Sequence, residues 1–266
     1  MKCPAFARAV LVLFALGLCA AASPTIAPKP LYRDPVYDGA ADPTLIWDRA
    51  GHRWLMFYTN RRASAHTLSG VTWVHGTRIG IAESRKGGAS WKYVGAANIN
   101  FGKPNYTHWA PEVIFNNGLY HMYLSIVSGI FSDWNAPREI VHLTSQNLMN
   151  WRYESTLDLH SHRVIDPCVI RLPNGNWRMW FKNERAHDGS IYFADSSNLS
   201  HWTPKGVALP GSKGEGPKVF RLSKSQERFP HTAQRAITRM SSSAPTGELT
   251  SFTSHTRWQA MRKANP

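Results

Sequence analysis

The chain has 266 residues, of which 42% are hydrophobic and 18% charged, so it has enough apolar material for a sizeable core and does not have the composition of a disordered chain. Its 31 lysines and arginines against 17 aspartates and glutamates give a formal charge of +14. This charge is dispersed, because residues 1–22 carry +2, residues 223–266 carry +5, and residues 23–222 carry 22 basic and 15 acidic residues, or +7. Nucleic-acid recognition needs a basic patch, so we expect no nucleic-acid partner.

Residues 1–22 have the pattern of a secretory signal peptide. Lys2 and Arg8 flank a short charged region, the run from residue 9 to 21 is almost wholly apolar, and small residues at 20–23 suit cleavage. This run is shorter than the ~20 apolar residues of a transmembrane helix. The sequence therefore predicts a secreted or periplasmic chain with no membrane span.

Removal of this segment leaves Cys168 as the only thiol of the mature chain. A single cysteine makes no intramolecular disulfide, so stability must come from packing. We expect Cys168, in a β-rich run, to be a small buried residue.

A repeated pattern fills residues 30–222. Each unit opens with a proline followed by a short β-rich run, then a turn glycine, an aromatic-x-Met pair, a third strand and a closing tryptophan. The opening prolines are Pro43, Pro111, Pro167 and Pro217; the pairs are Trp54/Met56, Tyr120/Met122 and Trp177/Met179; the closing residues are Trp91, Trp151 and Trp202.

The runs alternate with period two between turn residues, which indicates antiparallel strands joined by hairpins. The prolines lie 68, 56 and 50 residues apart, near the ~40–50 residues of a propeller blade once loop insertions are allowed. The fold class predicted is thus all-β, a β-propeller with about three and a half readable blades.

Carboxylates gather at the openings of these units. Asp42 and Asp166 directly precede their prolines, and Glu215 stands two residues before Pro217. The first strand of a blade lies nearest the propeller axis, so these side chains are expected in one central pocket. Crowded carboxylates raise each other's pKa, and glycoside hydrolysis needs such a pair of acid and base.

The motifs together resemble the five-bladed β-propeller glycoside hydrolases of family 43 and their relatives, which include arabinanases, arabinofuranosidases and β-xylosidases. The resemblance rests on Asp42-Pro43, the Trp-Ala-Pro-Glu segment at 109–112, Asp166-Pro167, the Glu-Gly-Pro segment at 215–217, and the Ser-x-Asn-Leu-x-x-Trp blade ends. It implies Asp42 as general base, Asp166 as the carboxylate that tunes pKa and orients, and Glu215 as general acid of an inverting mechanism. The implied activity is hydrolysis of O-glycosidic bonds in plant- or algal-type polysaccharides or oligosaccharides.

Sugar contacts are predicted beside the second opening. His108 and Trp109 lie there, and Trp109 is either a wall of the pocket or part of the core. Glu112 follows the proline, so the strand pleat should turn it away, and we assign it no catalytic role. His160 and His162 are expected in a surface loop because they lack a carboxylate at metal-ligand spacing. No cofactor is predicted; calcium is suggested by the family resemblance only.

Other functions remain open at this point. Fructan hydrolases share the propeller but carry an Asn-Asp-Pro-Asn context, whereas this chain has Ala-Asp-Pro-Thr. The arginine triad and tyrosine nucleophile of sialidases cannot be placed in this sequence. The alternative from another class is a noncatalytic carbohydrate-binding or inactive truncated propeller.

After Leu222 the repeat is no longer readable. Residues 223–266 are rich in Ser, Thr, Arg and Ala without period two, and we interpret them as an aperiodic tail, frame-shifted or disordered. The sequence predicts three parts: a signal peptide at 1–22, a glycosidase-like propeller at 30–222, and this tail. It does not predict the oligomeric state.

Overall fold

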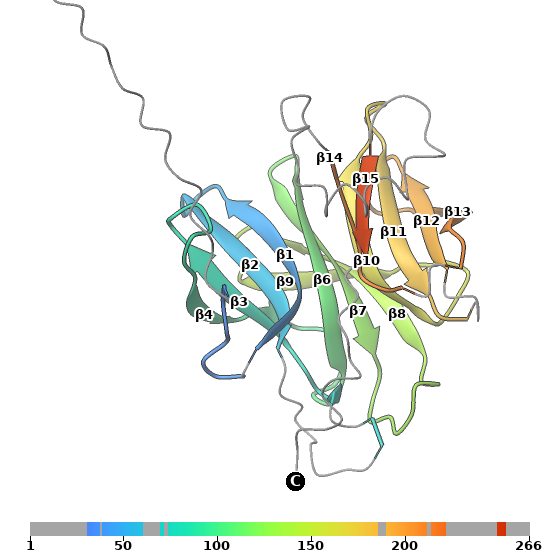
Figure 1. Ribbon diagram of the computed structural model, residues 1–266, viewed down its shortest axis with the longest axis horizontal. Helices are drawn as coiled ribbons and strands as arrows, with labels where there is room; N and C mark the ends of the chain where they lie inside the picture. Colours follow the sequence, from blue (N-terminus) through green and yellow to red (C-terminus); the bar gives the residue numbers. More distant parts are fainter. Residues whose placement is uncertain are drawn as a thin grey trace, which may run out of the picture.

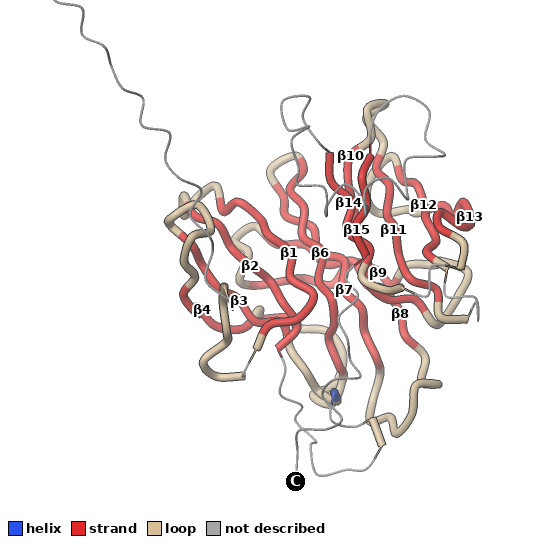
Figure 2. The backbone as a smooth tube through the Cα atoms, viewed as in Figure 1, coloured by secondary structure: helices blue, strands red, loops and turns tan. Residues whose placement is uncertain are grey.

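The computed structural model describes residues 31–37, 39–60, 70–71, 74–185, 190–211, 214–221 and 249–253. Within these ranges the protein is all-β and has no α-helix (Figures 1 and 2), as the repeat predicted. The predicted signal peptide and most of the predicted tail lie outside them.

Two four-stranded sheets and one five-stranded sheet lie side by side (Figure 1), and the four antiparallel strands of each are here called a blade. Blade 1 consists of β1 (Ala40–Asp48), β2 (Arg53–Asn60), β3 (Ile79–Ser84) and β4 (Lys92–Ala96); blade 2 of β6 (Thr107–Asn116), β7 (Leu119–Val127), β8 (Arg138–Ser145) and β9 (Asn150–Thr156); blade 3 of β10 (Val164–Arg171), β11 (Trp177–Asn183), β12 (Ile191–Ser196) and β13 (Thr203–Leu209). The short β5 (Asn98–Ile99) pairs in parallel with β9 and links blade 1 to blade 2. Each blade follows chain order, as hairpin-connected strands do.

The fourth strand of each blade was not foreseen from the sequence, which indicated only a closing tryptophan. The Ser-x-Asn-Leu-x-x-Trp motif after the third strand forms the turn that leads into this fourth strand. In blade 2, the Ser145 hydroxyl accepts hydrogen bonds from the backbone of Asn147 and Leu148, and the Trp151 indole donates to the Leu148 carbonyl at 3.1 Å. The same bonds recur around Ser196, Leu199 and Trp202 in blade 3. The motif is therefore a structural turn that leads into β9 and β13.

Apolar side chains fill the spaces between blades. One cluster joins Phe57 and Ile81 of blade 1 to Met122 and Leu143 of blade 2, and a second joins blade 2 to blade 3. The aromatic-x-Met pairs of blades 2 and 3 are buried, as expected for core residues, whereas Trp54 in blade 1 keeps 37% of its surface exposed. Packing of blade on blade thus supplies the core of this part of the chain.

A fourth unit begins beside blade 3. β14 (Pro217–Arg221) contacts β10 and pairs antiparallel with β15 (Leu249–Thr253), so the structure differs here from the expectation of no strand after residue 222. The five-residue segment is rich in threonine, a β-branched residue that favours strands even where the surrounding sequence is aperiodic. No helix in the part of the chain described is long and apolar enough to cross a membrane.

Candidate active site

The residue before each opening proline has an unusual backbone conformation. Asp42, Ala110, Asp166 and Gly216 have φ angles of 48°, 44°, 59° and 65°. In the first three blades the pairing of the inner strand with its neighbour slips by a bulge at this point. Bulges redirect side chains, and aspartate and glycine adopt positive φ more readily than other residues. The bulge therefore turns these positions out of the sheet and toward the propeller axis.

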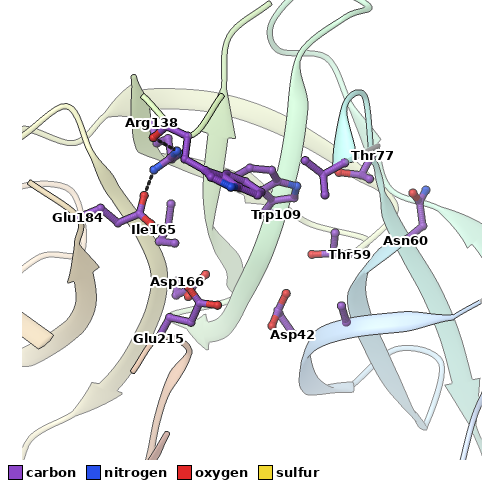
Figure 3. Close-up of a pocket in the computed structure, with 13 residues that line it drawn as sticks. Asp42, Thr59, Asn60, Thr77, Trp109, Arg138, Ile165, Asp166, Glu184 and Glu215 are labelled. Atoms are coloured by element: carbon purple, nitrogen blue, oxygen red, sulfur yellow. Dashed lines mark hydrogen bonds and ion pairs between the residues drawn. The ribbon is translucent and has the colours of Figure 1, made fainter. Parts of the chain in front are cut away.

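Residues of the inner strands β1, β6 and β10 and of the segment before β14 line one cavity of about 430 Å³. The three predicted catalytic carboxylates all line it: Asp42 from blade 1, Asp166 from blade 3 and Glu215 from the segment before β14 (Figure 3). The figure shows them converging at one end of the cavity, with Trp109 on its opposite side. These carboxylates are spread over 174 residues of the sequence, from 42 to 215, and the fold brings them together in one cavity.

Asp166 occupies the middle of this cluster. Burial raises the pKa of its carboxyl well above the usual range, and the negative charges of Asp42 and Glu215 raise it further. The Gly216 backbone N–H, which donates to Asp166 Oδ2 at 2.8 Å, and the Lys218 ammonium oppose this rise. Two carboxylates therefore act on the ionisation of a third, as carboxylates crowded in one cleft do.

Glu215 is held by contacts on either side of it in the chain. Lys182 of β11 donates to the Gly214 carbonyl at 2.8 Å, and Gly216 donates to Asp166 as described. Both partners belong to blade 3, so blade 3 fixes the backbone that carries Glu215. The offset of Glu215 from its proline also has a reason, since glycine takes the positive-φ position that aspartate takes in blades 1 and 3.

The opposite wall combines aromatic rings with a buried ion pair. Trp109 packs edge-on against Phe131 and lies 6.4 Å from Trp134 between ring centroids. Arg138, only 1% exposed, forms an ion pair with Glu184 and donates to the Trp134 carbonyl. Burial lowers the pKa of Arg138 to about 10, which leaves the guanidinium charged at neutral pH.

Of the two predicted sugar contacts, only Trp109 lies on the cavity. His108 is 3% exposed and is not among the residues that line it. Burial lowers the pKa of His108 to about 3, so its ring is neutral. The neighbouring side chains of a strand point to opposite faces, which explains why one residue faces the cavity and the other the interior.

Three further predictions concern residues outside the cavity. Glu112 is buried and does not line the cavity; its Oε2 atom forms an ion pair with Lys218 Nζ at 2.8 Å. Cys168 is buried and is a free thiol, as expected, and burial raises its pKa to about 12. His160 and His162 are exposed, and His162 contacts Glu139 at 3.0 Å.

Sequence reasoning missed the cavity residues Thr59, Asn60, Thr77, Trp134, Arg138 and Glu184. A usable signal existed for two of them. Thr77 and Arg138 each stand two residues before an isoleucine of the third strand of their blade, namely Ile79 and Ile140. Trp134 and Glu184 lie outside the repeated positions, so the pattern gave no sign of them.

Among the described residues, no group of three or more His, Cys, Asp or Glu side chains is arranged to hold a metal ion. Calcium stays a suggestion of the family resemblance alone.

Comparison with known proteins identifies the fold. No protein-family model and no curated protein matches the sequence. Solved structures that match include a β-1,3-galactosidase of glycoside hydrolase family 43 (TM-score 0.57, 15% identity, 74% of this chain and 70% of that one). A family 117 glycoside hydrolase from Zobellia galactanivorans matches with a TM-score of 0.55, 16% identity and coverage of 69% and 60%. A family 43 enzyme from Xanthomonas citri, solved with xylotriose, has a TM-score of 0.51, 13% identity and coverage of 69% and 64%.

These neighbours are glycoside hydrolases with a five-bladed β-propeller, and the chain has the fold of this group, which confirms the resemblance read from the motifs. At such low identities the likeness concerns the fold alone. The chain spans 58 to 70% of the length of the first four structures it matches.

Proposed function

We propose that this chain is a secreted or periplasmic glycoside hydrolase that cleaves O-glycosidic bonds of plant- or algal-type polysaccharides or oligosaccharides with inversion at the anomeric carbon. The observation that supports this most is the meeting of Asp42, Asp166 and Glu215 in one cavity with Trp109 across from them. Carboxylates facing an aromatic wall are suited to sugars, because sugar rings stack on aromatic faces while the acid and base act on the glycosidic bond.

In the proposed reaction Asp42 removes a proton from a water molecule, whose oxygen attacks the anomeric carbon. Glu215 donates its proton to the glycosidic oxygen as the bond from that oxygen to the anomeric carbon breaks. The products are a sugar with inverted configuration and a free alcohol, and Asp42 and Glu215 exchange their protonation states. An inverting pair needs room for the water, about 6.5–9.5 Å between the carboxyl groups.

Asp166 acts in this proposal through its neighbours. It binds the Gly216 N–H beside Glu215, which fixes the direction of the general acid. Asp166 is thus a positioning residue for the acid.

The Arg138–Glu184 ion pair and the Asn60 side chain offer hydrogen-bonding groups along the cavity wall. Because Glu184 compensates the charge of Arg138, this wall favours a neutral sugar over a uronic acid. The identity of the sugar rests on the loops around the cavity, for which a panel of aryl glycosides is the appropriate probe.

The proposal is tested with aryl glycosides of different leaving groups and two variants. Asp42→Asn should reduce kcat by about 10²–10⁴-fold on every substrate, since the base is needed whatever the leaving group. Glu215→Gln should cost as much on substrates with poor leaving groups but much less on dinitrophenyl glycosides, which depart without protonation. Equal losses for Glu215→Gln on both substrates would contradict its role as acid. Proton NMR of the first-formed product distinguishes inversion from retention.

The alternative is a noncatalytic sugar-binding propeller, and the partial coverage of the matched structures gives it weight. It predicts oligosaccharide binding, measured by calorimetry, without any product, and Asp42→Asn would then leave binding unchanged. Mass spectrometry of the exported protein tests secretion, with cleavage expected near residue 22.

A further inference from the structure

A second set of residues in the inner strands lies outside the cavity. Each stands one residue after an opening proline: Thr44, Glu112, Cys168 and Lys218. The first three are buried, Lys218 is half-buried, and none of the four lines the cavity. Since the bulge turns the residue before the proline toward the cavity, the residue after it faces the space between the inner strands.

Glu112 joins three inner strands through one carboxylate. It projects from β6, its Oε2 accepts a hydrogen bond from Lys218 Nζ of β14 at 2.8 Å, and its Oε1 accepts one from the Val169 backbone of β10 at 3.2 Å. Its side chain is 10% exposed. Removing only one partner of such a buried, hydrogen-bonded ion pair strongly destabilises the folded protein.

Lys218 stands three residues after Glu215 and two after Gly216, which binds Asp166. The charged groups facing its ammonium are Glu112 and Asp166, with the Cys168 thiol beside them. Burial alone lowers the pKa of Lys218, but these neighbours outweigh it and raise the pKa above its ordinary value. The ammonium is therefore charged. The Gly216 N–H bond to Asp166 and the Val219 N–H bond to Cys168 Sγ at 3.2 Å hold β14 alongside β10, so Lys218 lies in the strand next to the one that carries Asp166.

We propose that Lys218 is a positioning residue of this site: Glu112 holds its ammonium beside β10, so that β14 and the segment before it bring a compensating positive charge and Glu215 to the carboxylate cluster together. The inference rests on the proposed function for its effect on catalysis. The physical need is clear, because three carboxylates in one cavity repel one another and a nearby cation offsets that repulsion. Glu112, which the sequence left without a role, then holds the cation in place.

The first measurement does not depend on activity. The Asp166 carboxyl is titrated by carbon-13 NMR in the wild type, in Lys218→Met and in Lys218→Arg. Loss of the cation should raise the Asp166 pKa by about one pH unit, because a nearby opposite charge favours the ionised carboxylate, and arginine should restore it. Lys205→Met, which removes an exposed lysine of β13, should leave the titration unchanged. An unchanged Asp166 pKa in Lys218→Met would overturn the proposal.

The double variant Glu112→Met/Lys218→Met separates charge from structure. Replacing both members of a buried ion pair by apolar residues of similar size restores stability that a single replacement removes. We expect its unfolding midpoint to return toward that of the wild type while the Asp166 pKa remains raised. If the double variant recovers both the unfolding midpoint and the Asp166 pKa of the wild type, the ion pair only stabilises the fold and the proposal fails.

Kinetics supply the last arm. Lys218→Met and the double variant should lower kcat about tenfold or more with little change in KM, and should shift the acidic limb of the pH profile upward, whereas Lys218→Arg should retain most of kcat. If the wild type hydrolyses no glycoside, the proposed function fails, and the NMR titration still decides the role of Lys218.

Discussion

At the scale of single residues, the site depends on four positions with positive φ. Aspartate at 42 and 166 and glycine at 216 tolerate this conformation, but Ala110 in blade 2, with φ of 44°, has neither a polar side chain nor the freedom of glycine. Its backbone N–H donates to the Thr59 hydroxyl at 2.8 Å, so the surrounding structure holds it there. Blade 2 thus keeps the bulge without contributing a carboxylate.

Ala110→Gly should therefore stabilise the protein by about 1 kcal/mol, because glycine adopts positive φ without the penalty that a Cβ atom brings. Urea unfolding followed by tryptophan fluorescence measures this. Ala194→Gly is the matched control: Ala194 is buried in β12 and is not among the positive-φ residues, so glycine there should destabilise. A loss of stability in both variants would show that Ala110 is not strained.

At the scale of strands, the β7–β8 hairpin carries a buried polar stack between blades 2 and 3. His121 Nδ1 and His142 Nε2 lie 2.9 Å apart, the two rings are stacked, and His142 also stacks on Tyr123 at 5.0 Å. The Tyr123 hydroxyl donates to the Leu199 carbonyl at 2.6 Å. Burial, together with the neighbouring His121, lowers the pKa of His142 to about 4.

This stack makes the fold sensitive to acid. The folded protein resists protonation of His142, so its contribution is complete above the unfolded pKa of 6.5 and is lost as the pH falls through about 4. The difference between the folded and unfolded pKa of His142 corresponds to about 3 kcal/mol of unfolding free energy. His142→Gln should flatten the decline of the unfolding free energy between pH 6.5 and 4, while His201→Gln, at an exposed histidine, should not. Parallel declines in the wild type and His142→Gln would exclude His142 as the cause.

The strands that the sequence predicted are those with a strong pattern. The inner strands follow an opening proline, and the second strands contain the aromatic-x-Met pair, because both pack between blades. The fourth strands, such as β4 and β13, have largely exposed or half-exposed residues and no repeated motif, so alternation alone did not reveal them. The residues of the site differ in the same way. Asp42 and Asp166 occupy a repeated position, whereas Glu184 directly follows β11 in a single blade and meets Arg138 only in the folded molecule.

At the scale of the whole molecule, hydroxyl groups join each blade to the next at the inner strands. The Thr59 hydroxyl of blade 1 accepts from Ala110 of blade 2, and the Ser125 hydroxyl of blade 2 accepts from the Asp166 N–H of blade 3 at 3.0 Å. At the third joint the pattern changes, because Asp166 itself accepts from Gly216. A chain of hydrogen bonds thus runs through the blades and ends beside Glu215, so the position of the proposed acid depends on how the blades are joined.

Ser125→Ala tests this dependence. The variant removes the acceptor of the Asp166 N–H at a fully buried serine, and an unpaired buried donor costs about 1–3 kcal/mol, so the unfolding free energy should fall by that amount. Because the same residue carries the central carboxylate, kcat for glycosides with poor leaving groups should fall more than kcat for dinitrophenyl glycosides. Ser200→Ala, at an exposed serine of blade 3, should change neither quantity. If Ser125→Ala lowered stability but reduced kcat equally for both classes of glycoside, the joint would hold the fold without orienting the acid.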